Sequence, residues 1–428
     1  MRKYLAPILV ATLLLAACKS TSDKTTTGST SAPTSAAATD TRAPGVTSNS
    51  IQVGVTYADL SSLQDILHIN NGDFNKAYQA MFDSINAHGG INGRKIEATI
   101  IGVNPTQQSA ADTACTQLTQ DKKVFVTLGF FLNDNVLCYV STNQTAVIGG
   151  TMTPTRLAQA KAPWFTTDLS DRFEVQVVSS LAKAGKLDGK VAVVAAAADK
   201  DLATQAEAEL TNAGVKPVAT AILDAPTNDS AATFAQAATI SQKFQSAGAT
   251  KVLLVGQAIG GSYLPGLAKT SYRPELVFSN INSATTYAAA KGADLSVMAN
   301  SITGGPYGPA DAQFALGGVT AQCMSIQRAA GLTIKQPSTV AAGDPNQFSA
   351  SLQACQQVTL LEAILKKAGP TLNYGTFQAA GDSLTKIDLP GAPDPYSFGA
   401  APNGDGNPHI YPFAWNASDQ QYAIEKTS

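Results

Sequence analysis

Charged residues and histidines are scarce in this sequence. Of its 428 residues, 29 are Lys or Arg and 31 are Asp or Glu, so charged residues make up only 14% and the formal net charge is −2. No basic cluster with interleaved aromatic residues occurs, and nucleic acid is therefore not an expected partner. There is no CxxC pair, and the three histidines, His68, His88 and His409, do not lie at ligand spacing from a cysteine. A zinc site is the disfavoured alternative for the cysteines.

Long apolar runs are also missing, apart from one at the beginning of the chain. Residues 5–17 are apolar, follow Arg2 and Lys3, and end in small residues, which is typical of a secretory signal. At about 13 residues the run is too short to span a bilayer. Its last residues and Cys18 read Leu-Ala-Ala-Cys, which resembles a bacterial lipobox. We expect residues 1–17 to be a signal peptide and Cys18 to be the lipidation site. An ordinary signal peptide with an incidental cysteine is the alternative.

The residues after Cys18 lack the apolar side chains that could order them. Positions 18–48 consist mostly of Ser, Thr, Ala, Pro and Gly, so burial cannot offset the entropy of ordering. We expect a tether that joins a lipid anchor in the cell membrane to a globular body on its extracytoplasmic side. About 380 residues remain, which is long for one core and favours two lobes.

Sequence motifs of common enzymes are absent as well. There is no Walker A loop, Gly-x-Ser-x-Gly elbow or His-Glu-x-x-His. "GDSL" (381–384) lacks the downstream Asp-x-x-His that would activate its serine, and it falls where a helix is expected to end. "GQAIGG" (256–261) does not fit Gly-x-Gly-x-x-Gly, and we interpret it as a loop at a ligand cleft. We expect neither a cofactor nor an enzyme, and a secreted hydrolase is kept as the alternative.

Four cysteines remain besides Cys18, an even number for an exported chain. Their spacing favours the disulfides Cys115–Cys138 and Cys323–Cys355, although four cysteines allow three pairings.

Short β-branched and apolar runs alternate with longer segments of helical period. The runs lie at 51–58, 95–103, 124–130, 145–150, 190–197, 216–224, 251–257 and 275–281, and the first helices are expected at about 74–88 and 106–120. Strands that are buried on both faces show such continuous apolar runs. The pattern predicts an α/β protein with doubly wound parallel sheets.

The stretch "FDSINAHGGINGRKIEATIIG" (82–102), followed by "DKKVFVTLGF" (121–130), resembles the branched-chain amino acid type of solute-binding lipoproteins of ABC importers. The resemblance extends over about 49–425 through "TYADLSS" (56–62), "VIGGTMTPTRL" (147–157) and "NGDGNPHIYPFAW" (403–415). The last of these resembles the family's Gly-Asp-Gly turn and its final, aromatic-rich strand.

The resemblance implies the type I periplasmic-binding fold, with two lobes joined by three crossovers near 166–170, 303–307 and 389–396. Lobe 1 would comprise 49–167 and 306–390, and lobe 2 would comprise 168–305 and 391–428. It also implies a small-molecule solute that is delivered to an ABC permease with its ATPase. Separately, we expect a monomer. A ligand sensor of the same fold is an alternative, because fold alone does not separate the two roles.

Loops at the carboxyl ends of parallel strands line the ligand crevice of such sheets. We expect the ligand-binding residues in these loops. In lobe 1 they are Ser61, Ser62, Phe131, Asn133, Asp134, Thr151 and Thr153, of which the last four resemble the family's ligand contacts. In lobe 2 they are Asp199, Tyr263, Asn280 and Asn282. For the hydroxyl, amide and carboxylate side chains, helix N-capping is an equally good interpretation.

The family's amino acid binders have an acidic residue after the strand equivalent to 275–281, where this sequence has Asn280 and Asn282. A neutral amide does not supply the charged partner that an α-ammonium group needs when it leaves water. The sequence therefore favours a carboxylate or hydroxyl-rich solute over leucine, unless Asp134 or Asp199 supplies the charge.

Overall fold

The structure is a computed structural model. It describes residues 43–63, 70–168, 170–226, 229–288, 290, 292–341, 343–400, 403–406 and 408–425. The predicted signal peptide, Cys18 and most of the predicted tether lie outside the described residues. Within the described ranges, no helix has the length and apolar character needed to cross a bilayer.

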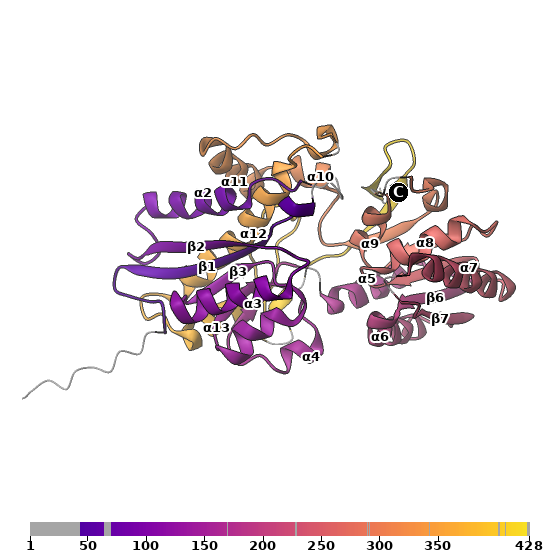
Figure 1. Ribbon diagram of the computed structural model, residues 1–428, viewed down its shortest axis with the longest axis horizontal. Coiled ribbons are helices and arrows are strands. Elements are labelled where there is room, and N and C mark those ends of the chain that lie inside the picture. Colours follow the sequence, from indigo (N-terminus) through magenta and orange to yellow (C-terminus); the bar gives the residue numbers. More distant parts are fainter. Residues whose placement is uncertain are drawn as a thin grey trace, which may run out of the picture. The chain divides into compact units, whose positions relative to one another are not determined.

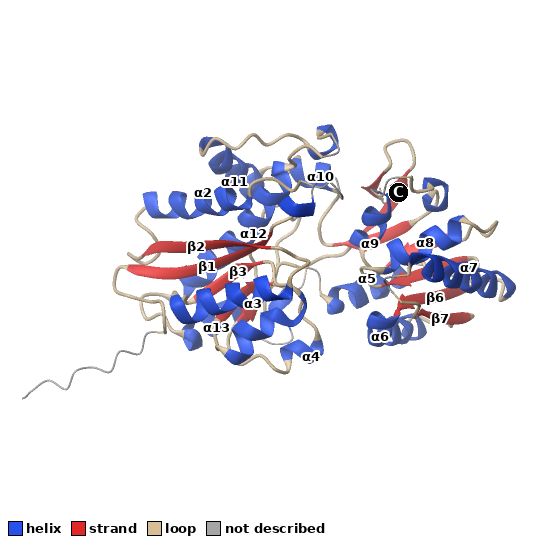
Figure 2. Cartoon of the chain, in the orientation of Figure 1, coloured by secondary structure: helices blue, strands red, loops and turns tan. Residues whose placement is uncertain are grey.

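The first sheet has five parallel strands in the order β2-β1-β3-β4-β5. Figure 2 labels three of them, β1, β2 and β3. They are β1 (Ser50–Ala58), β2 (Lys95–Val103), β3 (Val126–Gly129), β4 (Ala146–Gly149) and β5 (Trp164–Phe165). The apolar runs between positions 51 and 150 thus become β1 to β4, as predicted, and β5 is a short edge strand that the sequence pattern did not reveal.

Helices cover both faces of this sheet (Figure 1). On one face lie α2 (Phe74–Ala87), α11 (Gly318–Ala329), α12 (Gln347–Ala368) and α13 (Tyr374–Asp382). On the other lies α3 (Gln108–Thr116), which continues as a π-helical turn over Gln117–Asp121, together with α4 (Pro154–Leu157). The helix predicted at 106–120 is therefore α-helical only in its first part. Side chains alternate between the faces, so that Ile148 packs with α12 and Val147 with Cys115 and Leu118.

The second sheet has seven strands in the order β12-β11-β10-β9-β8-β6-β7. They are β6 (Val191–Ala196), β7 (Ala219–Leu223), β8 (Lys251–Val255), β9 (Glu275–Phe278), β10 (Ile302–Gly305), β11 (Tyr411–Asn416) and β12 (Gln421–Ile424). Strands β6 to β10 are parallel, and β11 and β12 join antiparallel. The turn and the strand predicted within 403–415 appear as the 3-10 turn Asn403–Asp405 and as β11, but β11 is not the last strand, because β12 follows it.

Two groups of helices cover this second sheet (Figure 1). One face packs against α5 (Asp171–Lys183) and α6 (Lys200–Asn212). The other packs against α7 (Ser230–Ser246), α8 (Ile259–Ala268) and α9 (Ile281–Ala288). A short helix, α10 (Ala310–Phe314), follows β10 as the chain returns toward the helices of the first sheet.

The segments that connect the two sheets contact one another. The Tyr307 hydroxyl, just after β10, donates a hydrogen bond to the Thr167 carbonyl at 3.1 Å, just after β5. The Tyr307 ring also stacks on Tyr396, with ring centroids 5.7 Å apart. At the start of α5, Arg172 forms an ion pair with the buried Asp405. Each of the three predicted crossing regions is therefore held to another one.

Both predicted disulfides are present in the structure. Cys115–Cys138 joins α3 to the π-helical turn Cys138–Thr142, and Cys323–Cys355 joins α11 to α12. The pairing predicted from local spacing is confirmed.

We predict that replacing Cys115 and Cys138 together by serine lowers the free energy of unfolding. The bridge closes a loop with a sequence separation of 23 residues, and loss of such a bridge costs about 3 kcal/mol through the entropy of the unfolded chain. Denaturant titration of oxidised wild-type and variant protein measures the effect. An unchanged midpoint and slope would show that this bridge adds nothing to stability.

Candidate functional site

Strands β3 and β4 end side by side in glycines with left-handed backbone. Gly129 has φ +115° and Gly149 has φ +124°. A Cβ atom at Gly149 would lie 2.4 Å from the Gly129 carbonyl oxygen, so only glycine fits there. The loops that follow these two strands therefore start in contact, at the edge where the predicted lobe 1 residues lie.

Arg156 in α4 ties these two loops together. Its Nε donates to Asp134 Oδ1 at 2.7 Å, and its Nη1 donates to the Thr151 carbonyl at 3.1 Å. Thr153 accepts a hydrogen bond from the Arg156 backbone N–H at 3.2 Å and caps α4. The capping interpretation thus holds for Thr153, whereas the side chains of Asn133 and Thr151 remain exposed at this edge. The sequence reasoning did not single out Arg156.

The remaining lobe 1 residues occupy two different environments. Ser61 and Ser62 are exposed, and the Ser62 hydroxyl accepts a hydrogen bond from Asn104 Nδ2 at 3.1 Å. Phe131 is only 8% exposed and packs edge-on against Tyr139, with centroids 5.1 Å apart. Phe131 is therefore a core residue in this structure, and its partly exposed neighbour Phe130 is the aromatic residue available at the edge.

At the second sheet, a buried carboxylate stands at the carboxyl ends of β8 and β9. Glu174, in the first turn of α5, is 7% exposed. It accepts hydrogen bonds from the Gly256 backbone N–H at 3.1 Å, from the Ser279 hydroxyl, and from Asn280 Nδ2 at 2.9 Å. Burial raises the pKa of Glu174 to about 7, although the bonds from Ser279 and Asn280 act in the opposite direction.

Asn280 and Asn282 stand where the sequence lacks the expected acidic residue. Asn280 is 4% exposed, donates to Glu174, and accepts from the Asn282 backbone N–H at 2.9 Å at the start of α9. Its amide is therefore occupied, and the exposed Asn282 side chain is the freer of the two.

Tyr263 does not belong to this edge. It is fully buried between α7 and α8, and its hydroxyl accepts a hydrogen bond from Ser241 at 3.0 Å. The prediction that Tyr263 contacts a ligand is wrong, because α8 begins at Ile259 and turns this side chain into the core.

Asp199 lies beside Glu174 at the same edge. A Cβ at Gly256 would be 2.1 Å from Asp199 Oδ2, so this partly exposed carboxylate rests against the Gly256 backbone. Burial and the nearby charge of Asp171 raise the pKa of Asp199. Burial also raises the pKa of Asp171, and the charge of Arg156 lowers it.

The carboxylates at this edge therefore come from α5 and from the loop after β6. None comes from the loop after β9, where the family's amino acid binders have an acidic residue. Glu174 carried one sequence signal, an acidic residue on the apolar face of α5 beside Phe173 and Val177. No group of three or more His, Cys, Asp or Glu side chains in the described ranges is arranged to hold a metal ion.

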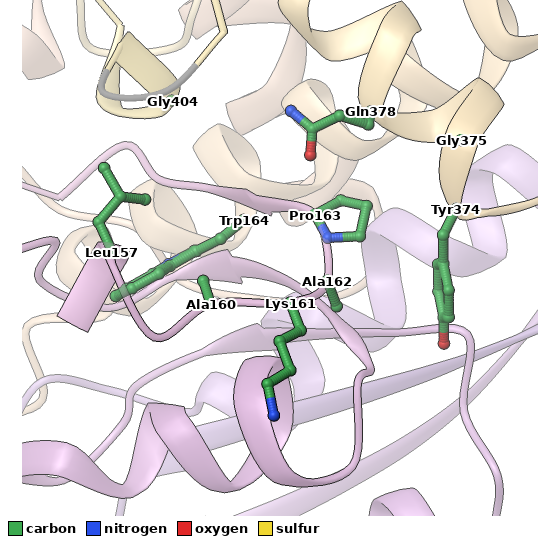
Figure 3. A pocket seen from close by; sticks show the side chains of 10 residues that line it. All are labelled: Leu157, Ala160, Lys161, Ala162, Pro163, Trp164, Tyr374, Gly375, Gln378 and Gly404. Atoms are coloured by element: carbon green, nitrogen blue, oxygen red, sulfur yellow. The ribbon is translucent and has the colours of Figure 1, made fainter.

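A pocket of about 410 Å³ lies elsewhere, at the outer edge of the first sheet (Figure 3). Its lining contains none of the predicted ligand contacts and is largely apolar, with Trp164 of β5 at its centre and α13 and Gly404 around it. The lining residues are Leu157, Ala160, Lys161, Ala162, Pro163, Trp164, Tyr374, Gly375, Gln378 and Gly404. We place the candidate site at the strand ends, because polar groups converge there from several loops.

No family model matches the sequence, and no curated protein is similar to it. Solved structures are similar to it. A type 1 periplasmic binding protein from Bordetella pertussis has a TM-score of 0.64 and 16% identity, over 88% of this chain and 100% of that one. A solute-binding protein of an ABC transporter from R. palustris, in complex with 4-hydroxybenzoate, has a TM-score of 0.63 and 14% identity, over 89% and 96%.

A third similar structure is an ABC transporter substrate-binding protein from Desulfitobacterium hafniense in complex with leucine. Its TM-score is 0.60 and its identity is 15%, over 87% of this chain and 100% of that one. The chain has the type I periplasmic-binding fold. The fold that the sequence resemblance implied is thereby confirmed. In this type I periplasmic-binding fold, the two edges described above are those where the parallel strands of each sheet have their carboxyl ends.

We predict that Glu174→Gln changes how stability depends on pH. The folded-state pKa of Glu174 is raised from 4.5 to about 7, so ionisation of this carboxyl opposes folding. The free energy of unfolding of the wild type should fall relative to the variant as pH rises from about 4.5 to about 7, by up to about 3 kcal/mol. Denaturant titrations across this range measure the difference.

Glu209→Gln, on α6, is the matched control. If wild type, Glu174→Gln and Glu209→Gln shared one pH profile, Glu174 would not titrate in this range.

Proposed function

We propose that this protein is the solute-binding component of an ABC importer. Residues 49–167 with 306–390, and 168–305 with 391–428, act as two lobes that close on a small organic solute. The observation that carries the proposal is that polar side chains converge at the carboxyl ends of the parallel strands in both sheets. The segments that connect the two sheets are held together by the Arg172–Asp405 ion pair and by the Tyr307 hydrogen bond. A solute that contacts both edges would stabilise the closed state, which a permease then recognises.

The same geometry gives no support to a hydrolase. Ser383 of the "GDSL" stretch follows the last residue of α13, and its hydroxyl donates to the Ala380 carbonyl at 2.9 Å, as in an ordinary helix end. Binding without covalent chemistry is the role that fits the edges. A largely enclosed pocket with a few directed hydrogen bonds reaches micromolar affinity, about −8 kcal/mol.

For the solute, we propose an α-amino acid in its zwitterionic form. The sequence argument against it relied on the missing carboxylate after β9, but Glu174 and Asp199 bring carboxylates to that edge from other elements. Glu174 already accepts three hydrogen bonds. Asp171 and Asp199 are both partly exposed, and neither carboxylate accepts a hydrogen bond among the described residues. Asp171 has the positive charge of Arg156 nearby, whereas Asp199 has no such partner, so we assign the α-ammonium group to Asp199.

The solute's carboxylate would then meet the exposed Asn133 and Thr151 at the first sheet, since amide and hydroxyl groups donate to oxygen atoms. A similar solved protein that holds leucine supports this class. Another holds 4-hydroxybenzoate, which has no ammonium group, and it supplies the competing probe.

We expect leucine, isoleucine or valine to bind the ligand-stripped protein with low-micromolar affinity, and 4-hydroxybenzoate not to bind. Asp199→Asn should weaken binding of the amino acid at least about tenfold, because an ammonium group loses its charged partner. Titration calorimetry measures both. Asp188→Asn, an exposed position before β6, is the control. Binding of 4-hydroxybenzoate alone would overturn the zwitterion assignment and favour the carboxylate class.

For the anchor, we predict that Cys18→Ser moves the protein from the membrane fraction to the soluble fraction of its natural host, because the acyl chains that hold it are lost. Fractionation followed by immunoblotting measures this. Affinity for the solute should stay unchanged. A variant that still sedimented with the membrane would refute lipidation at Cys18.

A further inference from the structure

Two side chains from one short segment hold a single peptide unit at the end of β4. Trp164 Nε1 donates a hydrogen bond to the Gly149 carbonyl at 2.8 Å, and the Gly150 backbone N–H donates to Asp168 Oδ2 at 2.8 Å. Gly149 and Gly150 both have positive φ, +124° and +72°. Glycine adopts such a backbone conformation readily, whereas other residues avoid it. The loop that it opens continues directly into Thr151 and Thr153.

The segment that carries Trp164 and Asp168 is the first crossing between the sheets. It comprises β5 and the residues after it, and Ser170, which caps α5, follows. On its other side the segment is fixed as well, because the Thr166 backbone N–H donates to the Gly404 carbonyl at 2.9 Å. The segment thus lies between the β4–α4 loop and the turn at 403–406.

Ionisation of Asp168 costs free energy in this environment. No described residue forms an ion pair with it. The titratable groups that face it are Tyr78 from α2 and Tyr307 after β10, and neither can carry a positive charge. Burial accordingly raises the pKa of Asp168 to about 6, with the Gly150 N–H bond in opposition. Among the described residues, the Gly150 N–H is the one donor to this carboxylate.

We propose that Trp164 and Asp168 are positioning residues that couple the first crossover to the solute-contacting loop. Lobe closure changes the backbone angles of a few connecting residues. Because two hydrogen bonds join the Gly149–Gly150 peptide to that connection, the loop with Thr151 moves with the crossover, and the state of the hinge sets the geometry of the loop. This role rests on the proposed solute-binding function, but the two hydrogen bonds are tested without any solute.

Hydrogen–deuterium exchange of the apo protein, read at single-amide resolution, tests the coupling. In Asp168→Ala, the Gly150 amide should exchange about tenfold faster than in the wild type, since it loses its acceptor. Exchange should also rise at 151–153 and 166–170. Trp164→Phe, which keeps an aromatic side chain but removes the indole N–H, should loosen the same two segments. Asp188→Ala is the control and should alter neither.

Asp168→Asn retains an oxygen acceptor and should restore most of the protection, which loss of packing would not explain. Unchanged exchange at 150–153 in both Asp168→Ala and Trp164→Phe would overturn the coupling, whatever the protein binds.

A second experiment repeats the exchange measurement with leucine as the ligand. If it binds, it should slow exchange in both segments of the wild type together, but only at 150–153 in Asp168→Ala. If it does not bind, the proposed solute is wrong, and the apo result still decides the coupling.

Discussion

The parallel direction of the strands is a constraint that determines where the loops of each sheet meet. β1 to β5 run parallel in one sheet and β6 to β10 run parallel in the other, so the carboxyl ends of each set lie along one edge. Loops that are far apart in sequence are forced together there. Gly129 and Gly149 let two of them start in contact, and Gly256 lets Asp199 rest against the backbone at the other edge.

The same constraint explains why charge gathers where it is costly. A helix that follows a crossing segment begins beside the strand ends, so acidic residues in the first turn of α5 reach the edge of the second sheet. Glu174 is stabilised there by donors from Gly256, the residue after β8, and from Ser279 and Asn280, the two residues between β9 and α9. Its burial still opposes ionisation, and so does that of Asp168 in the crossover. The second edge thus combines a hydrogen-bonded carboxylate, Glu174, with two, Asp171 and Asp199, that accept no hydrogen bond among the described residues.

Much of the fold could be predicted from the sequence because its signals are local. Buried parallel strands show as apolar runs, and cysteines close in sequence on neighbouring elements pair locally, as Cys115 and Cys138 do. The site was harder, because its contacts join distant segments. Neither the approach of Glu174 to Asn280 nor that of Asp168 to Gly150 leaves a spacing pattern in the chain. Tyr263 was misplaced because "GQAIGG" suggested a loop, whereas α8 starts inside that stretch.

Capture of a small solute without its chemical transformation can be tested on the protein purified under native conditions from its natural host. The protein is denatured, and the released molecules are identified by mass spectrometry. We expect one intact zwitterionic amino acid in near-stoichiometric amount, and none from Asp199→Asn protein prepared in the same way. Recovery of a non-amino-acid solute, or equal recovery of the amino acid from the variant, would refute capture of the amino acid through Asp199.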